Sequence, residues 1–150
     1  MSHGGGIYIG LANRDIAVDG CTLKGNRAGY GGGAYMNTQN DITVRYNVFR
    51  FCVARKDGGA VYSDSYNQIS VQHTNFSSNT AGGDGGAVML SSDHSGTVFA
   101  YTDFSGNRAA GSGGAISVTG TGNRKWNVAG CTLTNNCAGS AGGGMYAVQL

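Results

Sequence analysis

The chain repeats one glycine-rich phrase along its whole length. Residues 76–90 read FSSNTAGGDGGAVML, and residues 104–118 read FSGNRAAGSGGAISV. A glycine pair followed by a small or apolar residue recurs with steps of 27, 26, 27, 28 and 30 residues between its third positions. A period of this length is typical of a solenoid, in which each unit buries its apolar face only against its neighbours. The third positions are Ile7, Ala34, Ala60, Ala87, Ala115 and Met145.

A second phrase lies between successive glycine pairs, in which Leu or Phe is followed three residues later by Asn. From this Leu or Phe to the next third position the distance is 11 residues four times and 12 once, whereas in the other direction it varies from 15 to 18. One corner of each unit therefore has a nearly fixed length, and the other accepts insertions. The phrase is carried by Leu23 and Asn26, Phe49 and Cys52, Phe76 and Asn79, Phe104 and Asn107, and Leu133 and Asn136.

An alternating pair of mostly apolar residues precedes each Leu or Phe by seven and five positions, as Ile42 and Val44 precede Phe49. Alternate residues of a strand share one face. The pair and the Phe can both face inward only if the chain bends between them. The bends are expected near Gly20, Tyr46, His73, Tyr101 and Gly130.

Composition disfavours a helical fold. The chain has 28 glycines and no proline, and its acidic residues are all Asp. Without Glu and with few Lys, it is poor helix material. We predict one all-β domain over residues 1–150, a right-handed parallel β-helix of about five rungs with three short strands per rung. The hand follows from the crossover preference of parallel strands.

The Asn of the second phrase predicts an asparagine ladder inside one corner. An inward Asn can bond to backbone groups and to the Asn of the next rung. Cys52 is expected to interrupt the ladder and to reduce stability, because a thiol forms only weak hydrogen bonds. The ladder positions are Asn26, Cys52, Asn79, Asn107 and Asn136.

The paired phrases resemble the polymorphic outer membrane protein repeats of chlamydial surface proteins. The resemblance rests on GGAV at 58 and 85, GGAI at 113, FSSN at 76 and FSGN at 104. The outer units depart from it with Leu for Phe, with GGGI and GGGM, and with Cys52 for Asn. The resemblance implies a pectin-lyase-like β-helix that serves as a cell-surface passenger in adhesion. The wider superfamily includes polysaccharide lyases and glycosidases, and the fold does not choose among these functions.

Two pairs of carboxylates are expected on adjacent rungs. Asp15 and Asp41 both lie eight residues before the Leu or Phe, and Asp57 and Asp84 both precede a glycine pair. Carboxylates about 5 Å apart suit Ca²⁺ or acid–base chemistry on a glycosidic bond. Asp at strand starts and glycine turns is also ordinary turn chemistry. We favour the turn interpretation and expect no cofactor, with Ca²⁺ as the alternative.

Three aromatic residues are expected to stack on an outer corner. Tyr46, His73 and Tyr101 occupy equivalent places on three consecutive rungs. Aromatic faces suit sugar rings, and stacked aromatics also stabilise a solenoid; we favour stabilisation. His3 and His94 are isolated and lack the spacing of metal ligands.

The leading hypothesis is a non-enzymatic structural or adhesive β-helix module at a cell surface or in an extracellular fibre. The alternative is a carbohydrate-active enzyme or polysaccharide-binding module. The net charge of +2 is too small to favour nucleic acid, and neither a membrane span nor a signal peptide is visible. We expect the ends of the solenoid to be covered by further repeats of a longer chain or by other chains. Cys131 and Cys137 share a rung, where free thiols are favoured over a disulfide.

Overall fold

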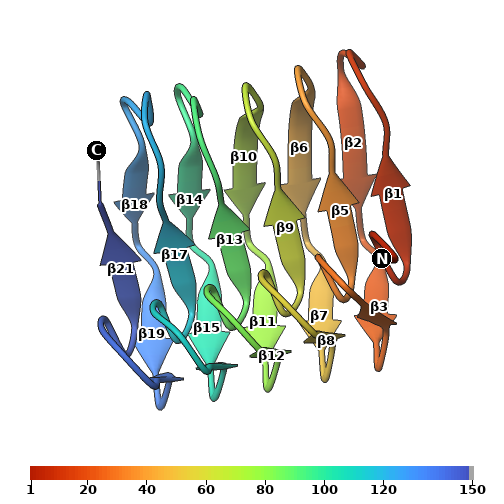
Figure 1. The fold of residues 1–150 in the computed structure, drawn as a ribbon. Coiled ribbons are helices and arrows are strands. Elements are labelled where there is room, and N and C mark those ends of the chain that lie inside the picture. Colours follow the sequence, from red (N-terminus) through yellow and green to blue (C-terminus); the bar gives the residue numbers. More distant parts are fainter. Residues whose placement is uncertain (149–150) are drawn as a thin grey trace.

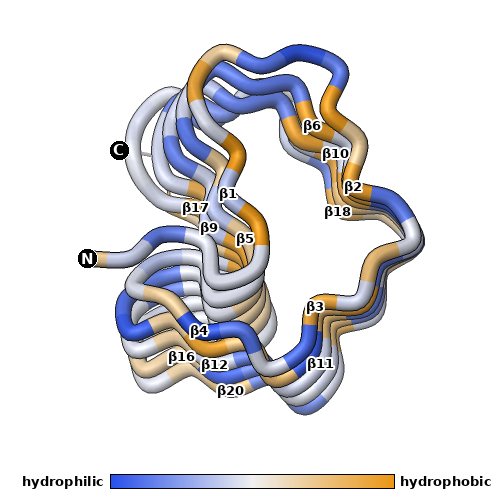
Figure 2. The backbone as a smooth tube through the Cα atoms, turned by 90° about the vertical axis from the view of Figure 1, so that its right-hand side faces the viewer, coloured by the Kyte–Doolittle hydropathy of each residue, from blue (hydrophilic) through white to orange (hydrophobic). Residues whose placement is uncertain are grey.

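A computed structural model describes residues 1–148 as a stack of coils that form a β-solenoid (Figure 1). The residues described contain 21 strands and no helix, and every strand pairing is parallel. Seen from its N-terminal end, the chain runs clockwise as it recedes (Figure 2), so the solenoid is right-handed. The predicted right-handed parallel β-helix of about five rungs is confirmed.

Two sheets hold the first two strands of each coil. Sheet I begins and ends the described stack and has six strands, and sheet II has five. Sheet I consists of β1 (Ile7–Ile9), β5 (Ala34–Met36), β9 (Val61–Ser63), β13 (Val88–Leu90), β17 (Ile116–Val118) and β21 (Met145–Ala147). Sheet II consists of β2 (Ile16–Asp19), β6 (Asp41–Arg45), β10 (Gln68–Gln72), β14 (Val98–Ala100) and β18 (Asn127–Ala129).

Two further sheets of five strands complete each coil. Three strands per rung were expected; the structure adds a fourth, which has only two residues. A pair of residues is too short to produce an alternating pattern, so the sequence gave no sign of it. Sheet III consists of β3 (Thr22–Lys24), β7 (Val48–Arg50), β11 (Asn75–Ser77), β15 (Asp103–Ser105) and β19 (Thr132–Thr134). Sheet IV consists of β4 (Arg27–Ala28), β8 (Val53–Ala54), β12 (Thr80–Ala81), β16 (Arg108–Ala109) and β20 (Cys137–Ala138).

The register in sheet I corrects the predicted alignment of the glycine phrases. Ala34 pairs with Val61, and Ile116 pairs with Met145, so Ala60 and Ala115 are not equivalent to the other third positions. The glycine of GGGA at residue 33 takes the place that Ala60 has in the next coil. The true steps are 27, 27, 27, 28 and 29 residues.

The core is built from columns, which are sets of residues at the same place in successive coils. Ile42 and Val44 of β6 and Phe49 of β7 are buried, as predicted. The bends between sheets II and III are also confirmed, because Gly20, Tyr46, His73, Tyr101 and Gly130 all have positive φ. Trp126, expected to face inward, is 40% exposed because it belongs to the last described coil. Inside the coils, Phe49, Phe76 and Phe104 stack at 4.9 and 5.0 Å between ring centroids.

The glycine pair has a steric reason. Gly58 has φ +66°, a conformation that other residues rarely adopt. Gly59 packs directly against the next coil: a Cβ there would lie 2.0 Å from the carbonyl oxygen of Gly86 and 2.7 Å from the backbone of Thr80. Only glycine allows two coils to approach so closely at this point.

Candidate functional site

The predicted ladder positions lie in the fixed corner between sheets III and IV. The backbone N–H and the Nδ2 of Asn79 both donate to Oδ1 of Asn107 at 3.0 Å, and Asn107 donates to Asn136 in the same way. Nδ2 of Asn79 also donates to the carbonyl of Phe49 at 3.0 Å. The column thereby provides partners for backbone groups that the corner leaves buried.

Cys52 stands in this column without replacing the function of an asparagine. Its backbone N–H donates to Oδ1 of Asn79 at 3.0 Å, and its thiol lies 3.4 Å from the carbonyl oxygen of Leu23. A thiol offers only a weak acceptor to the amide of Asn26 in the first coil. Burial raises the pKa of the Cys52 thiol, so this cysteine is a packed, unreactive group.

A second polar column lies in the variable corner between sheets I and II, where none was predicted. Asn13 donates to Oδ1 of Asn40 through its backbone N–H at 2.9 Å, and Asn40 donates to Asn67 at 2.8 Å. In the next coils the backbone N–H of His94 donates to Oδ1 of Asn123 at 3.0 Å. The fixed offset that revealed the first ladder is missing here, because insertions shift these residues relative to the strands.

His94 forms a buried pair with Ser63. Ser63 Oγ lies 2.7 Å from His94 Nε2 and accepts a hydrogen bond from Asn67 Nδ2 at 2.9 Å. We assign Ser63 as the donor to Nε2, which requires a neutral ring. Burial lowers the pKa of His94 to about 4. Both side chains are almost fully buried, so a substrate cannot reach this serine–histidine pair.

Asp57 and Asp84 serve the turns in which they lie. Oδ1 of Asp57 accepts the backbone N–H of Asp84 at 2.8 Å, and Oδ1 of Asp84 accepts that of Ser112 at 2.7 Å. Each carboxylate therefore links its own glycine turn to the turn of the next coil. This geometry is that of turn chemistry.

Asp41 lies in a groove on the variable corner. The groove has a volume of about 620 Å³ and crosses three coils. Asp15 is next to Asp41 in the strand register, but its side chain does not line the groove. The lining residues are Ala12, Asn13, Arg14, Gln39, Asn40, Asp41, Tyr66 and Gln68.

The groove offers free polar groups. Within residues 1–148, the side chains of Arg14, Gln39, Asp41, Tyr66 and Gln68 make no hydrogen bond to other protein groups. Tyr66 is 61% exposed although its φ of +59° is unfavourable for a bulky residue. One acid, one base, two amides and one phenol suit a ligand that carries several hydroxyl groups.

The predicted aromatic stack forms on the corner between sheets II and III. The rings of Tyr46, His73 and Tyr101 are nearly parallel, with centroids 5.2 and 5.3 Å apart. A further ring does not fit between them. The outer face of Tyr101 packs over Gly130, where a Cβ would lie 2.7 Å from the ring. A ligand could therefore contact only the ring edges and the free face of Tyr46.

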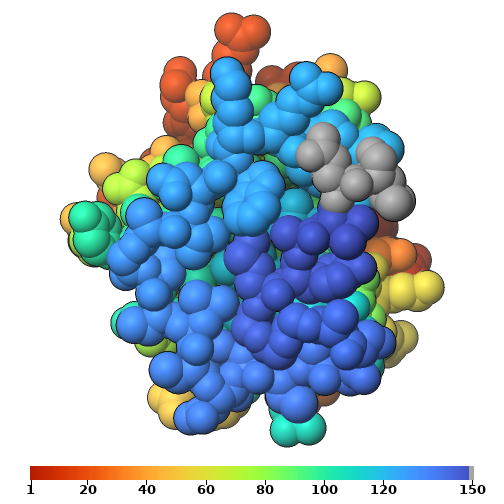
Figure 3. Space-filling model, turned by 90° about the vertical axis from the view of Figure 1, so that its left-hand side faces the viewer, coloured from red at the N-terminus to blue at the C-terminus, as the bar shows by residue number. Residues whose placement is uncertain are grey.

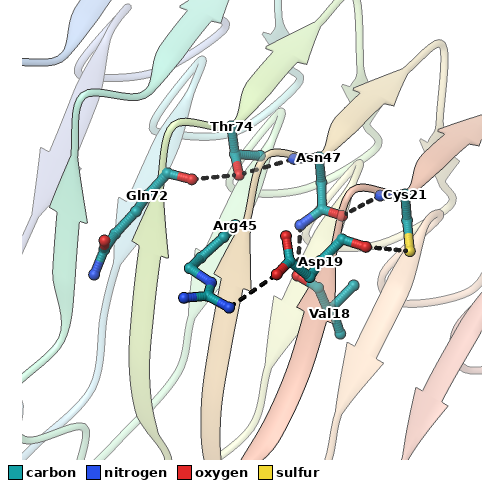
Figure 4. Close-up of polar contacts among 7 residues, drawn as sticks. All are labelled: Val18, Asp19, Cys21, Arg45, Asn47, Gln72 and Thr74. Atoms are coloured by element: carbon teal, nitrogen blue, oxygen red, sulfur yellow. Dashed lines mark hydrogen bonds and ion pairs between the residues drawn. The ribbon is translucent and has the colours of Figure 1, made fainter.

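Polar contacts fix this corner from inside (Figure 4). Oδ1 of Asn47 accepts the backbone N–H of Cys21 at 2.8 Å, and its Nδ2 donates to the carbonyl of Val18 at 2.7 Å. On the outside, Arg45 forms an ion pair with Asp19 at 2.8 Å. The aromatic stack thus stands on a rigid corner.

The Phe–Asn phrase, the ladder and the glycine pair occur together most regularly in the third and fourth coils. Residues 73–91 and 101–119 match the family model described as the Chlamydia polymorphic membrane protein (Chlamydia_PMP) repeat. These two segments are polymorphic membrane protein repeats. No curated protein and no solved structure shows a significant match to the chain.

Each polymorphic membrane protein repeat runs from the corner before sheet III to the end of the next strand of sheet I. The repeat therefore contains the ladder asparagine and the close glycine contact, and it leaves out the variable corner. The groove beside Asp41 lies outside both matched segments. The repeat accounts for the scaffold and not for the groove.

A second aromatic stack outside the repeats was not predicted. Tyr8, Tyr35 and Tyr62 project from the outer face of sheet I, with ring centroids 5.6 and 5.4 Å apart. The hydroxyl of Tyr35 donates to Asp64 at 2.9 Å, and burial together with Asp64 raises the pKa of Tyr35. Their place directly after the glycine phrase, one residue on from the inward position, was the available signal.

Metal-binding and membrane-spanning features are not found in the part of the chain that the structure describes. Residues 1–148 contain no group of three or more His, Cys, Asp or Glu side chains placed to hold a metal ion. No helix in this range could cross a membrane. All four cysteines are free; Cys52 is buried and Cys137 is exposed.

Proposed function

We propose that this protein is a β-helix module presented at a cell surface or in an extracellular fibre, where it acts in adhesion without catalysis. The observation that supports this role best is the pair of polymorphic membrane protein repeats within a continuous solenoid. Ladders and stacked aromatic cores join each coil to the next, which suits a rigid support for exposed faces. The role requires no cofactor.

The last described coil supports association with further protein. Val128, Leu133 and Met145 pack against the core and are only partly buried there. Figure 3 shows this end of the stack, with the last coil spread across it. We propose that further coils of the same polypeptide, or another chain added end to end, cover this surface.

Surface location and adhesion are tested separately. Antibodies to the folded protein should label intact cells of the native source, and protease treatment of intact cells should remove the label. Beads coated with the protein should adhere to a cell or matrix layer more than beads coated with the heat-unfolded protein. Equal adhesion of the two bead types would contradict the adhesive role. The intact mass of the native protein shows whether further coils are present.

Polysaccharide binding is the second candidate, because the groove beside Asp41 supports it. Its volume lies in the range of small-ligand sites, and Tyr66 presents a flat face beside free hydrogen-bonding groups. Asp41 is the only carboxylate among its lining residues. Glycosidases commonly need two carboxyl groups, so the groove suits binding better than hydrolysis.

A polysaccharide panel tests the groove. Asp41→Asn and Tyr66→Asn should each weaken binding about tenfold, because each removes a contact to the sugar. Asn tolerates the left-handed backbone of residue 66. Tyr46→Asn is the matched control, since Tyr46 is equally exposed and also has positive φ but lies on another corner. Loss of binding in the control, or none in the groove variants, would refute this site.

A further inference from the structure

Exposed cations gather on one side of the solenoid. They lie at the ends of sheet III strands, on the outer side of sheet IV and in the turn after it. Within residues 1–148 none of them forms an ion pair, because the ion pair present there joins Arg45 to Asp19. We call this surface the basic face; it consists of Lys24, Arg27, Arg50, Arg55, Lys56 and Arg108.

The strand register makes most of the basic face continuous. Lys24 pairs with Arg50 across sheet III. Arg27 pairs with Val53, two residues before Arg55, in sheet IV. Neighbouring strands lie about 4.8 Å apart, so the first two coils carry five positive charges close together. Arg108 extends the face to the fourth coil.

Little negative charge opposes these cations. Asp57 follows Lys56 in the chain, and its Oδ1 accepts the amide of Asp84. Asp19 and Asp41 belong to sheet II, which lies across the coil from sheet IV (Figure 2). The small net charge of the chain therefore conceals a marked local excess of positive charge.

Part of the basic face is shaped to receive an anionic group. A pocket of about 150 Å³ is lined by Ser2, Arg27, Ala28, Val53 and Arg55. Beside it, the guanidinium of Arg50 lies 4.6 Å above the ring of Phe51, which restrains it. Guanidinium groups bind sulfate and carboxylate oxygens through two parallel hydrogen bonds.

We propose that the basic face binds an anionic polysaccharide, with sulfate or carboxylate groups of successive sugars on successive coils. A linear polyanion fits because the charges follow the stacked strands. Single-stranded nucleic acid would need a series of free aromatic faces. Phe51 is the one aromatic residue in the strands and corner that carry Lys24, Arg27 and Arg50, and Arg50 covers it. The groove beside Asp41 is a separate surface.

Binding to immobilised heparin, which carries both sulfate and carboxylate groups, tests the proposal with the full chain. The wild type should bind, and binding should weaken as salt rises. Arg27→Gln with Arg55→Gln should reduce affinity at least about tenfold, because both guanidinium contacts are lost. Desulfated heparin and polygalacturonate then show whether sulfate or carboxylate is preferred.

The matched control is Arg124→Gln with Lys125→Gln, which removes the same charge beside sheet II. It should change affinity less than about twofold. Equal losses in the two double variants would overturn the proposal, since only overall charge would matter. No binding to any anionic polysaccharide, or tighter binding to oligo-dT or to anionic lipid vesicles, would also overturn it. Unchanged melting temperatures show that both variants remain folded.

Discussion

At the residue scale, His94 is the side chain whose ionisation matters most for stability. It occupies a place where neighbouring coils hold Asn67 and Asn123, and it is 2% exposed. Its neutral ring accepts the Ser63 hydroxyl, whereas a protonated ring cannot. Burial lowers the pKa of His94 to about 4, from an ordinary value of 6.5.

We therefore predict that acid destabilises the protein through this residue. Between pH 6.5 and about 4 the unfolded chain binds a proton that the folded chain excludes. The stability contributed by neutral His94 is complete above pH 6.5 and is lost as pH falls toward 4, by about 3 kcal/mol in total. Urea unfolding at a series of pH values measures this dependence.

His94→Asn is the decisive variant for the acid effect. Asn suits the polar column and does not titrate, so the slope of stability between pH 4 and 6.5 should become smaller. His3→Asn is the control, because His3 is exposed, and it should leave the slope unchanged. An unaltered slope in His94→Asn would show that other groups cause the acid sensitivity.

At the scale of strands and corners, the sequence predicted what repeats at a fixed offset. Sheets II and III follow from alternating apolar residues such as Ile42 and Val44, and the Asn79 column follows from its constant distance to Phe76. The alignment at Gly33 failed because glycine and alanine both fit that place: a Cβ on Gly33 would lie 2.9 Å from Phe49, close enough for small shifts to accommodate it.

Corners of variable length were beyond sequence reasoning. The column of Asn40, Asn67 and His94 shifts by a residue between coils, so no single spacing reveals it. The groove beside Asp41 depends on where three loops diverge, which is a property of the packed coils. Asp57 and Asp84 were placed correctly on adjacent coils, and only the hydrogen bonds of Asp57 and Asp84 distinguish turn chemistry from a ligand site.

At the scale of the whole molecule, stability depends on how well each coil is joined to the next. In a solenoid each unit contacts only its neighbours, so a weak junction lets one end open while the rest stays folded. The Asn ladder runs from Asn136 through Asn107 and Asn79 to Cys52, and the first coil lies beyond this cysteine.

Cys52→Asn should extend the ladder to the first coil. The new Oδ1 would accept the amide of Asn26, as Asn107 accepts that of Asn79, and Gly33 leaves room because it has no Cβ beside Cys52. One added buried hydrogen bond contributes about 1 kcal/mol, or about fivefold slower amide exchange in β3 and β4. Hydrogen exchange of the full chain measures this, and amides of β15 should not change. Cys137→Asn, an exposed change outside the ladder, should have no effect. Unchanged or faster exchange of the first coil in Cys52→Asn would show that its attachment to the stack rests on packing rather than on the ladder.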